Sequence, residues 1–313
     1  MLGTLIILFN SQVVTSQSPN TDPVPIDTTI RELGLIQNKQ ITESSGLALS
    51  TRDPNVLWTH NDSGDVARIF ALDLKGRHLG EFIIEDETFH DVEDIVAYEY
   101  EGKHRLLIGD IGDNNKKRKS GKLYVIKEPK LKKEHASKPT TISVSRKFKY
   151  HYEDGPQDCE SLAIDPRTRT VYFVEKNRIW DNDHVATIYK MPWPKKSDDE
   201  TPIAKAIGSM SFPLEGAMTI AQARAQGTIP FMTTASDMSR DSTRFVVQTY
   251  TVAYEYLRTE GQSWADAFKK APRRLSMPRR RQGESVCYST DGKSLYLTSE
   301  KLPAPLWEVT PKD

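Results

Sequence analysis

Five short segments of the chain share one pattern of polar and apolar positions. In each, an acidic or small polar residue is followed, after one further residue, by an apolar anchor and more strand-like sequence. The segments are ESSGLALS from Glu43, DVEDIVAY from Asp91, DCESLAID from Asp158, TASDMSRD from Thr234 and QGESVCYSTDG from Gln282. Aligning their anchors places five polar residues in one column: Ser45, Glu93, Glu160, Ser236 and Glu284. Such recurrence indicates an internal structural repeat.

The sequence after each segment repeats as well. A turn comes first, then a β-rich run, a polar loop and a second β-rich run; the first runs read VLWTHND, RLLIGDIGDN, VYFVEKN, RFVVQTY and LYLTSE. Most units end in a fourth amphipathic run, such as HLGEFIIE. Enrichment in Val, Ile, Tyr and Phe between Gly, Pro and Asp turns predicts β-strands. Four-stranded units repeated in this way predict an all-β fold, a β-propeller, with a β-sandwich as the alternative.

The repeat count predicts five blades. The last unit has three strands before the chain ends, and the lone strand-like run TTIRELGLIQN near the N-terminus can supply its fourth. This 3+1 closure would remove a free sheet edge. A sixth blade is the alternative, because the gap between the third and fourth anchors is long. We expect its sequence, EGAMTIAQARAQGTIPFM, to form a loop with a short helical piece, and GQSWADAFKKA to form a helical insertion in the fourth blade.

The N-terminus resembles a secretory signal peptide. The apolar run Leu5 to Phe9 is too short to span a bilayer, and small or β-branched residues suited to cleavage follow at 14–16. We therefore expect a signal peptide over 1–16, a disordered leader over 17–28 and a single propeller domain over 29–313, in a secreted or periplasmic protein. No Lys or Arg follows Met1, so a buried first strand and a misplaced start codon stay as alternatives.

Composition narrows the function classes. The 313 residues carry 43 Lys and Arg against 43 Asp and Glu, a balance that argues against general nucleic-acid binding. We expect a monomer that does not span a membrane. Cys159 and Cys287 form no C-x-x-C motif, so they signal no zinc site; a disulfide and two buried thiols both stay open.

In a propeller, the loop before each innermost strand and the loop between its second and third strands lie on one rim. These loops hold many of the acidic residues, which we expect to converge on one mouth of the central channel. Crowded carboxylates raise one another's pKa unless a cation lies between them, and calcium prefers six to eight oxygen ligands. We therefore expect a calcium site at the mouth; a solvated funnel with Arg and Lys counterions is the alternative.

Other side chains of this mouth are candidates for substrate binding and catalysis. Basic runs containing Lys116 and the pair Arg279–Arg280 would suit an anionic small molecule or glycan, although solvated loop charge is the simpler interpretation. Asn61, Asp62 and Asn114 are further candidates for substrate binding. His60 and His90 are candidate general bases, or merely hydrogen-bonding residues.

Several motifs together resemble a known group of proteins. ESSGLALS, VLWTHNDSGD, DVEDIV, LIGDIGDN and GESVCYSTDGKSLYLTSE are similar to exported bacterial β-propeller proteins, loosely akin to phytase-like (esterase-like) propellers. The acid-to-apolar start of each unit is shared more broadly with gluconolactonase-like and paraoxonase-like propellers. The resemblance covers roughly residues 40–310.

This resemblance implies a central cation that acts as a Lewis acid on a lactone, ester or phosphate oxygen. By position, its ligands would be Glu93, Asp110, Asp113, Glu160 and Glu284. Ser45 and Ser236 replace Glu in two units, so the site would be lopsided. Two functions stay open: calcium-dependent hydrolysis of an anionic ester, lactone or phosphoester, and non-catalytic binding of a polysaccharide, peptide or envelope partner with structural calcium.

Overall fold

The computed structural model describes residues 22–176, 185–195, 201–211 and 232–312. These residues form an all-β structure, with 3-10 helix η1 (Lys133–Ala136) and the short α-helix α2 (Trp264–Ala267). No helix in this part of the chain has the length and apolar character that crossing a membrane requires.

The strands form antiparallel units of four that follow the chain order. The first unit is β3 (Ser44–Leu49), β4 (Val56–Asn61), β5 (Arg68–Asp73) and β6 (His78–Ile84). The second is β7 (Val92–Tyr100), β8 (Lys103–Asp110), β9 (Gly121–Lys127) and β11 (Val144–Tyr152). The third is β12 (Cys159–Asp165), β13 (Thr170–Glu175), β14 (Val185–Pro192) and β15 (Ile203–Ser211).

The last two units complete the set. The fourth is β16 (Thr233–Met238), β17 (Arg244–Thr249), β18 (Val252–Leu257) and β19 (Arg273–Ser276). The fifth combines β20 (Ser285–Tyr288), β21 (Leu295–Thr298) and β22 (Pro305–Pro311) with β2 (Thr28–Leu35) from the other end of the chain. β2 pairs antiparallel with β22.

Short parallel pairings extend or connect these units. β1 (Val24–Ile26) lies beside β19, and β10 (Thr140–Ile142) lies beside β6. A two-residue parallel pairing of β11 with β15 joins the second and third units into one eight-stranded sheet. β1 falls inside the segment 17–28 that the sequence predicts as a disordered leader, so the end of that segment is ordered as a strand.

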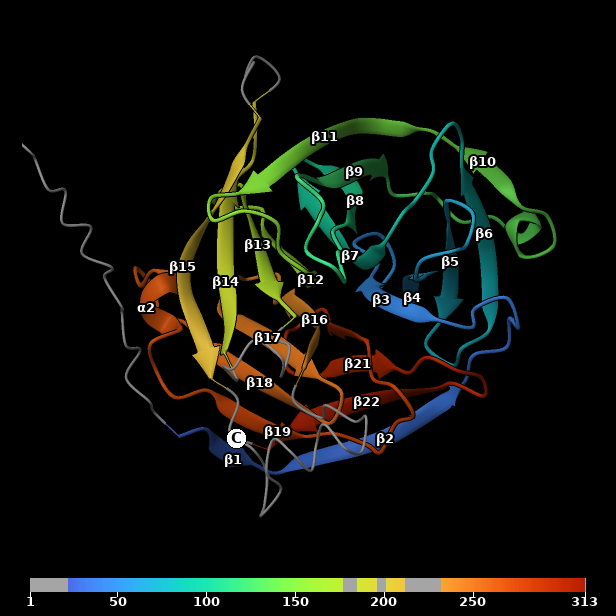
Figure 1. Cartoon of the computed structure of the whole chain (residues 1–313). Helices are drawn as coiled ribbons and strands as arrows, with labels where there is room; N and C mark the ends of the chain where they lie inside the picture. The colour runs from blue at the N-terminus through green and yellow to red at the C-terminus, as the bar shows by residue number, and fades with distance from the viewer. Residues whose placement is uncertain (1–21, 177–184, 196–200, 212–231, 313) are drawn as a thin grey trace, which may run out of the picture.

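The first strands of the units contact one another in a cycle. β3 contacts β7, β7 contacts β12, β12 contacts β16, β16 contacts β20, and β20 contacts β3. Figure 1 shows β3, β7, β12 and β16 near the middle of the molecule, with the later strands of each unit farther out. Every residue of β3 and of β12 is buried, as expected of strands enclosed on both faces. The first strands therefore surround a shared central region.

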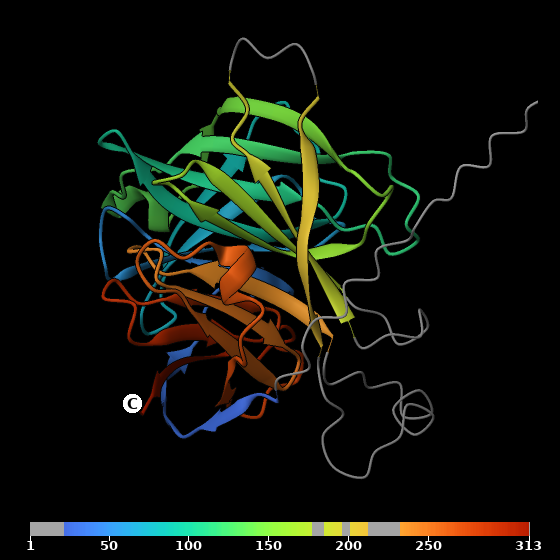
Figure 2. The ribbon, with the colours of Figure 1, turned by 90° about the vertical axis from the view of Figure 1, so that its left-hand side faces the viewer.

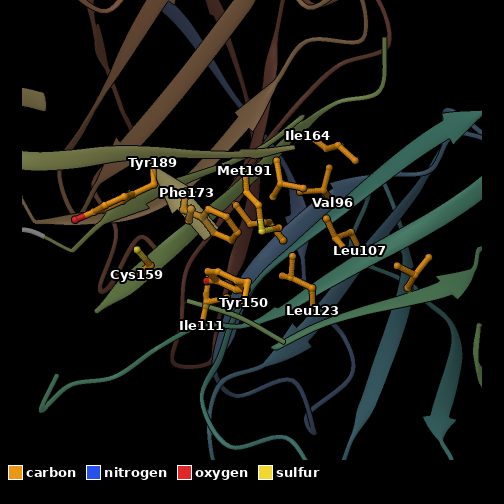
Figure 3. Packing of buried hydrophobic residues seen from close by; sticks show 14 of the residues in the cluster. Val96, Leu107, Ile111, Leu123, Tyr150, Cys159, Ile164, Phe173, Tyr189 and Met191 are labelled. Atoms are coloured by element: carbon orange, nitrogen blue, oxygen red, sulfur yellow. The ribbon is translucent and has the colours of Figure 1, made fainter. Parts of the chain in front are cut away.

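Apolar side chains between neighbouring units form the core. Figure 3 shows the cluster that fills the space between the second and third units, which includes Leu107, Tyr150 and Phe173. The rings of Tyr150 and Phe173 are stacked with centroids 4.5 Å apart. Such packing fixes the angle between units, and with it the positions of the loops that the strands carry.

Smaller predictions had different outcomes. α2 lies within GQSWADAFKKA and on the outer side of the fourth unit (Figure 2), so the predicted helical insertion is confirmed. Cys159 and Cys287 are both buried free thiols in separate core clusters, which answers the question of their pairing. The predicted signal peptide and the predicted loop over 215–231 lie outside the described residues.

Candidate functional site

A β-bulge near the start of the first strand sets the direction of one polar side chain in four units. The strand register shifts around Ser45, Glu93, Glu160 and Thr234. A bulge inserts one extra residue and re-aims its side chain, which is common beside functional sites. The sequence alignment is therefore correct for the first three units but displaced by two residues in the fourth. There Thr234, and not Ser236, is the bulged residue.

Among the described residues, three carboxylates from two units lie close enough together to share a metal ion. Asp62 follows β4, Asp91 precedes β7, and Glu93 is the bulged residue of β7; one carboxylate oxygen of each lies within 4.8 Å of the others. Glu93 is buried, whereas Asp62 and Asp91 are half-buried. The hydroxyl of Ser45 donates to Glu93 Oε2 at 3.3 Å. We call Asp62, Asp91 and Glu93 the acidic triad.

Backbone hydrogen bonds from the segment LIGDIGDNN (residues 107–115) hold part of this triad in place. The amides of Ile111 and Gly112 both donate to the Asp91 carbonyl, at 3.0 and 3.1 Å. Gly112 must lack a side chain, because a Cβ there would lie 2.2 Å from Glu93 Oε1 and 2.6 Å from the Asp91 carboxylate. The second Gly-Asp step of the segment therefore makes space for two carboxylates.

The triad is electrostatically crowded. Burial, and then the charge of Glu160, raise the pKa of Glu93 well above its usual value. Burial and Asp158 raise the pKa of Asp91. Burial raises the pKa of Asp62 to about 6, with contributions from Asp91 and Glu284. Each shift shows that the ionised carboxylate lacks sufficient positive charge in its surroundings.

A buried lysine lies among the neighbouring acids. Lys176, directly after β13, donates from Nζ to Glu160 Oε1. Although burial alone would lower the pKa of Lys176, the charges of Glu160 and Glu93 and the Tyr250 hydroxyl group raise it above its usual value. The sequence analysis missed Lys176, because a lone lysine in the VYFVEKN run looks like ordinary surface charge. This ammonium supplies part of the positive charge that the sequence led us to expect from calcium.

Two of the predicted metal ligands, Asp110 and Asp113, accept hydrogen bonds from Arg118. Its Nη2 donates to Asp110 Oδ1 at 2.6 Å, and its backbone amide donates to Asp113 Oδ2 at 2.5 Å. The other oxygen of buried Asp110, Oδ2, has no hydrogen-bond partner in the described part of the chain. The basic run KKRK at 116–119, which contains Lys116, thus provides a counterion through Arg118, while Lys116 forms an ion pair with Glu175 at 2.9 Å.

The last predicted ligand, Glu284, belongs to a pair of carboxyl groups. Its Oε1 accepts from Gln282 Nε2 at 2.7 Å. Burial, followed by a hydrogen bond with Glu284, raises the pKa of Glu300 to about 10. A hydrogen bond between two carboxyl groups requires a proton on one of them, and the raised pKa favours Glu300 as the group that carries it.

The two candidate general bases differ in their exposure to solvent. His60 is fully buried, its Nδ1 lies 2.8 Å from the Asn61 carbonyl, and burial lowers its pKa to about 4. Its Nε2 approaches the Cα of Gly46 so closely that a Cβ there would lie 2.6 Å away. His90 is exposed and directly precedes Asp91. Of the two, only His90 has the access to solvent that a general base at the mouth needs.

Of the predicted substrate-binding residues, Asp62 belongs to the acidic triad, and Asn61 and Arg280 have structural partners. Asn61 Oδ1 accepts from the amides of Thr42 and Glu43, and its Nδ2 donates to Gln40 and Asp65. Arg280 is half-buried and donates to Gln248 Oε1 at 2.8 Å, and the desolvation of its guanidinium lowers its pKa to about 10. Asn114 and Arg279 are exposed and stay predictions.

Comparison with known proteins adds a distant structural similarity. No protein-family model matches the chain, and no curated protein sequence matches it significantly. Among solved structures, a gluconolactonase from Xanthomonas campestris is similar with a TM-score of 0.42 and 10% sequence identity, over 86% of this chain and 72% of that one.

Proposed function

We propose that the chain is a five-bladed β-propeller, each four-stranded unit forming one blade and β2 completing the fifth. The cyclic contacts of the first strands and the pairing of β2 with β22 support this assignment. In such a ring, the loops before the first strands and after the second strands share one mouth, where Asp62, Asp91 and Glu93 lie.

We further propose that the acidic triad holds a divalent cation, with calcium as the first candidate. The single observation that carries this proposal is the convergence of three carboxylate oxygens within 4.8 Å. Their raised pKa values fit a hard cation that prefers oxygen ligands. Glu93 is shared with the ligand set predicted from the resemblance; Glu160, Asp110 and Asp113 instead contact Lys176 or Arg118.

The activity we propose is hydrolysis of an ester, lactone or phosphoester by an exported enzyme. When bound, the cation would polarise the substrate oxygen. The exposed His90 imidazole would accept the proton of the attacking water at Nδ1 or Nε2, beside Asp91. The exposed Arg279, in the loop before β20, would attract an anionic substrate.

A non-catalytic propeller with a structural cation is the second candidate. It is favoured by the internal counterions, because Lys176 and Arg118 already bind several of the acids. In this case the mouth would bind a polysaccharide, peptide or envelope partner.

Two matched variants test the cation site. We expect Asp91→Asn combined with Glu93→Gln to abolish calcium binding in isothermal titration. Asp110→Asn should retain it within about threefold, because Arg118 already pairs with that carboxylate. Loss of calcium binding in Asp110→Asn with retention in Asp91→Asn alone would favour the resemblance-based ligand set, because Glu93 belongs to both sets. No calcium binding by the native protein would reject both sets.

Activity is then measured separately. A panel of lactones, carboxylic esters and phosphoesters is incubated with the native protein, with calcium and after chelation. Turnover that requires calcium and falls at least about a hundredfold in His90→Ala supports the hydrolase with His90 as base. Calcium binding without turnover of any substrate would favour the binding propeller.

A further inference from the structure

A second cleft lies at the other end of the strands that carry the acidic triad. It has a volume of about 460 Å³ and lies between the second and third units, where β7 turns into β8. Glu93 and Tyr100 are seven residues apart on β7, which places this cleft about 23 Å along the strand from the triad. It is therefore a separate site, and its ligand chemistry is independent of the proposed hydrolase.

Strand register lines up cationic and aromatic side chains on one face of the cleft. Arg105 of β8 is opposite Tyr98 of β7 on one side and Lys127 of β9 on the other. Lys103 is opposite Tyr100 one step farther along. Because side chains alternate along a strand, these five residues share one face of the sheet.

The pairing of Arg105 with Lys127 is unfavourable on its own. Like charges directly opposite on neighbouring strands destabilise a sheet. The neighbouring acid Glu99 lies on the other face of the sheet, opposite His104 and 3.8 Å from it. Lys103, Arg105 and Lys127 have no hydrogen bond or ion pair to a carboxylate in the described part of the chain. The lining holds one acidic residue, Glu101.

Aromatic rings form another wall of the same cleft. Trp193 and Tyr98 have ring centroids 5.7 Å apart. Arg169 adds a further cation, with its guanidinium 5.1 Å from the centre of the Tyr100 ring. The segment carrying Trp193 is held by Arg146, which donates to the Pro194 and Lys195 carbonyls at 2.6 and 3.1 Å. The cleft thus combines a fixed aromatic surface with several cations.

We propose that this cleft binds a small molecule in which a phosphate monoester is attached to a ring, such as a sugar phosphate or a nucleoside monophosphate. Two negative charges at neutral pH suit the Arg105–Lys127 pair, and guanidinium groups bind phosphate oxygens in pairs. The ring would lie against Trp193 or Tyr100. The cleft volume is within the range of small-molecule sites.

Binding is tested with three probes on the full chain: adenosine monophosphate, glucose 6-phosphate and inorganic phosphate. Isothermal titration should give saturable binding of at least one ring compound, at least about tenfold tighter than inorganic phosphate. The tighter of the two ring compounds identifies the kind of ring. Arg105→Gln and Lys103→Ala should each weaken that binding about tenfold, the effect expected for loss of one charge-assisted contact.

Lys293→Ala is the matched control, because Lys293 occupies the equivalent exposed hairpin turn between the first two strands of the fifth unit. It should leave the dissociation constant unchanged. The proposal is overturned if neither ring compound binds, if inorganic phosphate binds equally well, or if Arg105→Gln and Lys103→Ala bind like the native protein. Asp91→Asn combined with Glu93→Gln should leave this binding intact, so failure of the cation site and failure of this site are distinguishable.

Discussion

The two ends of the strand pair β7 and β8 carry opposite charge, and they differ in whether these charges have internal counterions. At the mouth, several acidic residues are buried and have internal partners, as Glu160 has Lys176 and Asp110 has Arg118. At the far end, Arg105 and Lys127 lie opposite each other without a carboxylate partner among the described residues. A net charge of zero for the chain therefore conceals two local excesses of opposite sign. Excess charge therefore marks a candidate site only where internal counterions are insufficient.

The largest effect should come from removing the internal cation of the mouth. Lys176→Met should lower the free energy of unfolding by about 3–5 kcal/mol, because Glu160 would stay buried without its partner. Chemical denaturation measures this change. Lys269→Met is the control: its ion pair with Asp266 is exposed and should contribute less than about 1 kcal/mol. Equal effects of the two variants would mean that Lys176 does not stabilise the buried acids.

The second-largest effect should be a stabilisation of the folded protein by calcium that depends on pH. The folded-state pKa of Asp62 is raised from 3.8 to about 6, so its contribution to stability is present below pH 3.8 and is lost as pH rises through 6. A bound cation would offset the resulting repulsion above pH 6. At a concentration one hundred times the dissociation constant measured at pH 7.5, calcium should therefore add about 2.7 kcal/mol there and clearly less at pH 5. Melting curves at both pH values test this; an equal gain at both would contradict the crowding argument.

A smaller effect should follow from filling the space beside the triad. Gly112→Ala would place a methyl group against Glu93 and Asp91, and overpacking costs about 1–3 kcal/mol. Calcium affinity should fall as well, because the two carboxylates must move apart. Gly208→Ala in β15 is the control, since a Cβ there meets nothing within 4 Å. If Gly112→Ala retains native stability and calcium affinity, the close packing at Gly112 does not set the triad's geometry.

The smallest effect should be an increase in the free energy of unfolding, and it should come from the cleft that contains Arg105 and Lys127. Arg105→Gln removes one of two like charges that face each other, so it should stabilise the ligand-free protein by about 0.5 kcal/mol. A purely structural arginine would instead destabilise the protein when replaced. Thermal unfolding at low ionic strength distinguishes these outcomes, and the gain should shrink as salt screens the repulsion.

The sequence predicted the all-β class and the units because strand periodicity and turns are local signals. It also placed Glu93 at the mouth, since repeat alignment carries position from unit to unit. It could not identify Lys176 or Arg118 as counterions, because their partners lie on other strands or across a loop. The fourth unit was aligned two residues out of register, since neither Thr234 nor Ser236 is acidic and a bulge leaves no compositional signal. The far cleft was missed because its cations come from separate strands.

The pairing of β2 with β22 has a consequence for the order of folding. Arg31 and Glu308 form an ion pair across this ladder although 277 positions separate them in sequence. During translation, β2 is synthesised long before β22. β2 therefore has no pairing partner until the other units of the sheet structure have been synthesised. Contacts of such long range form slowly. Until they form, the unpaired edge of β21 or β22 is open to pairing with a strand of another molecule. Nascent chains halted before residue 305 should therefore be far more prone to proteolysis than the released protein.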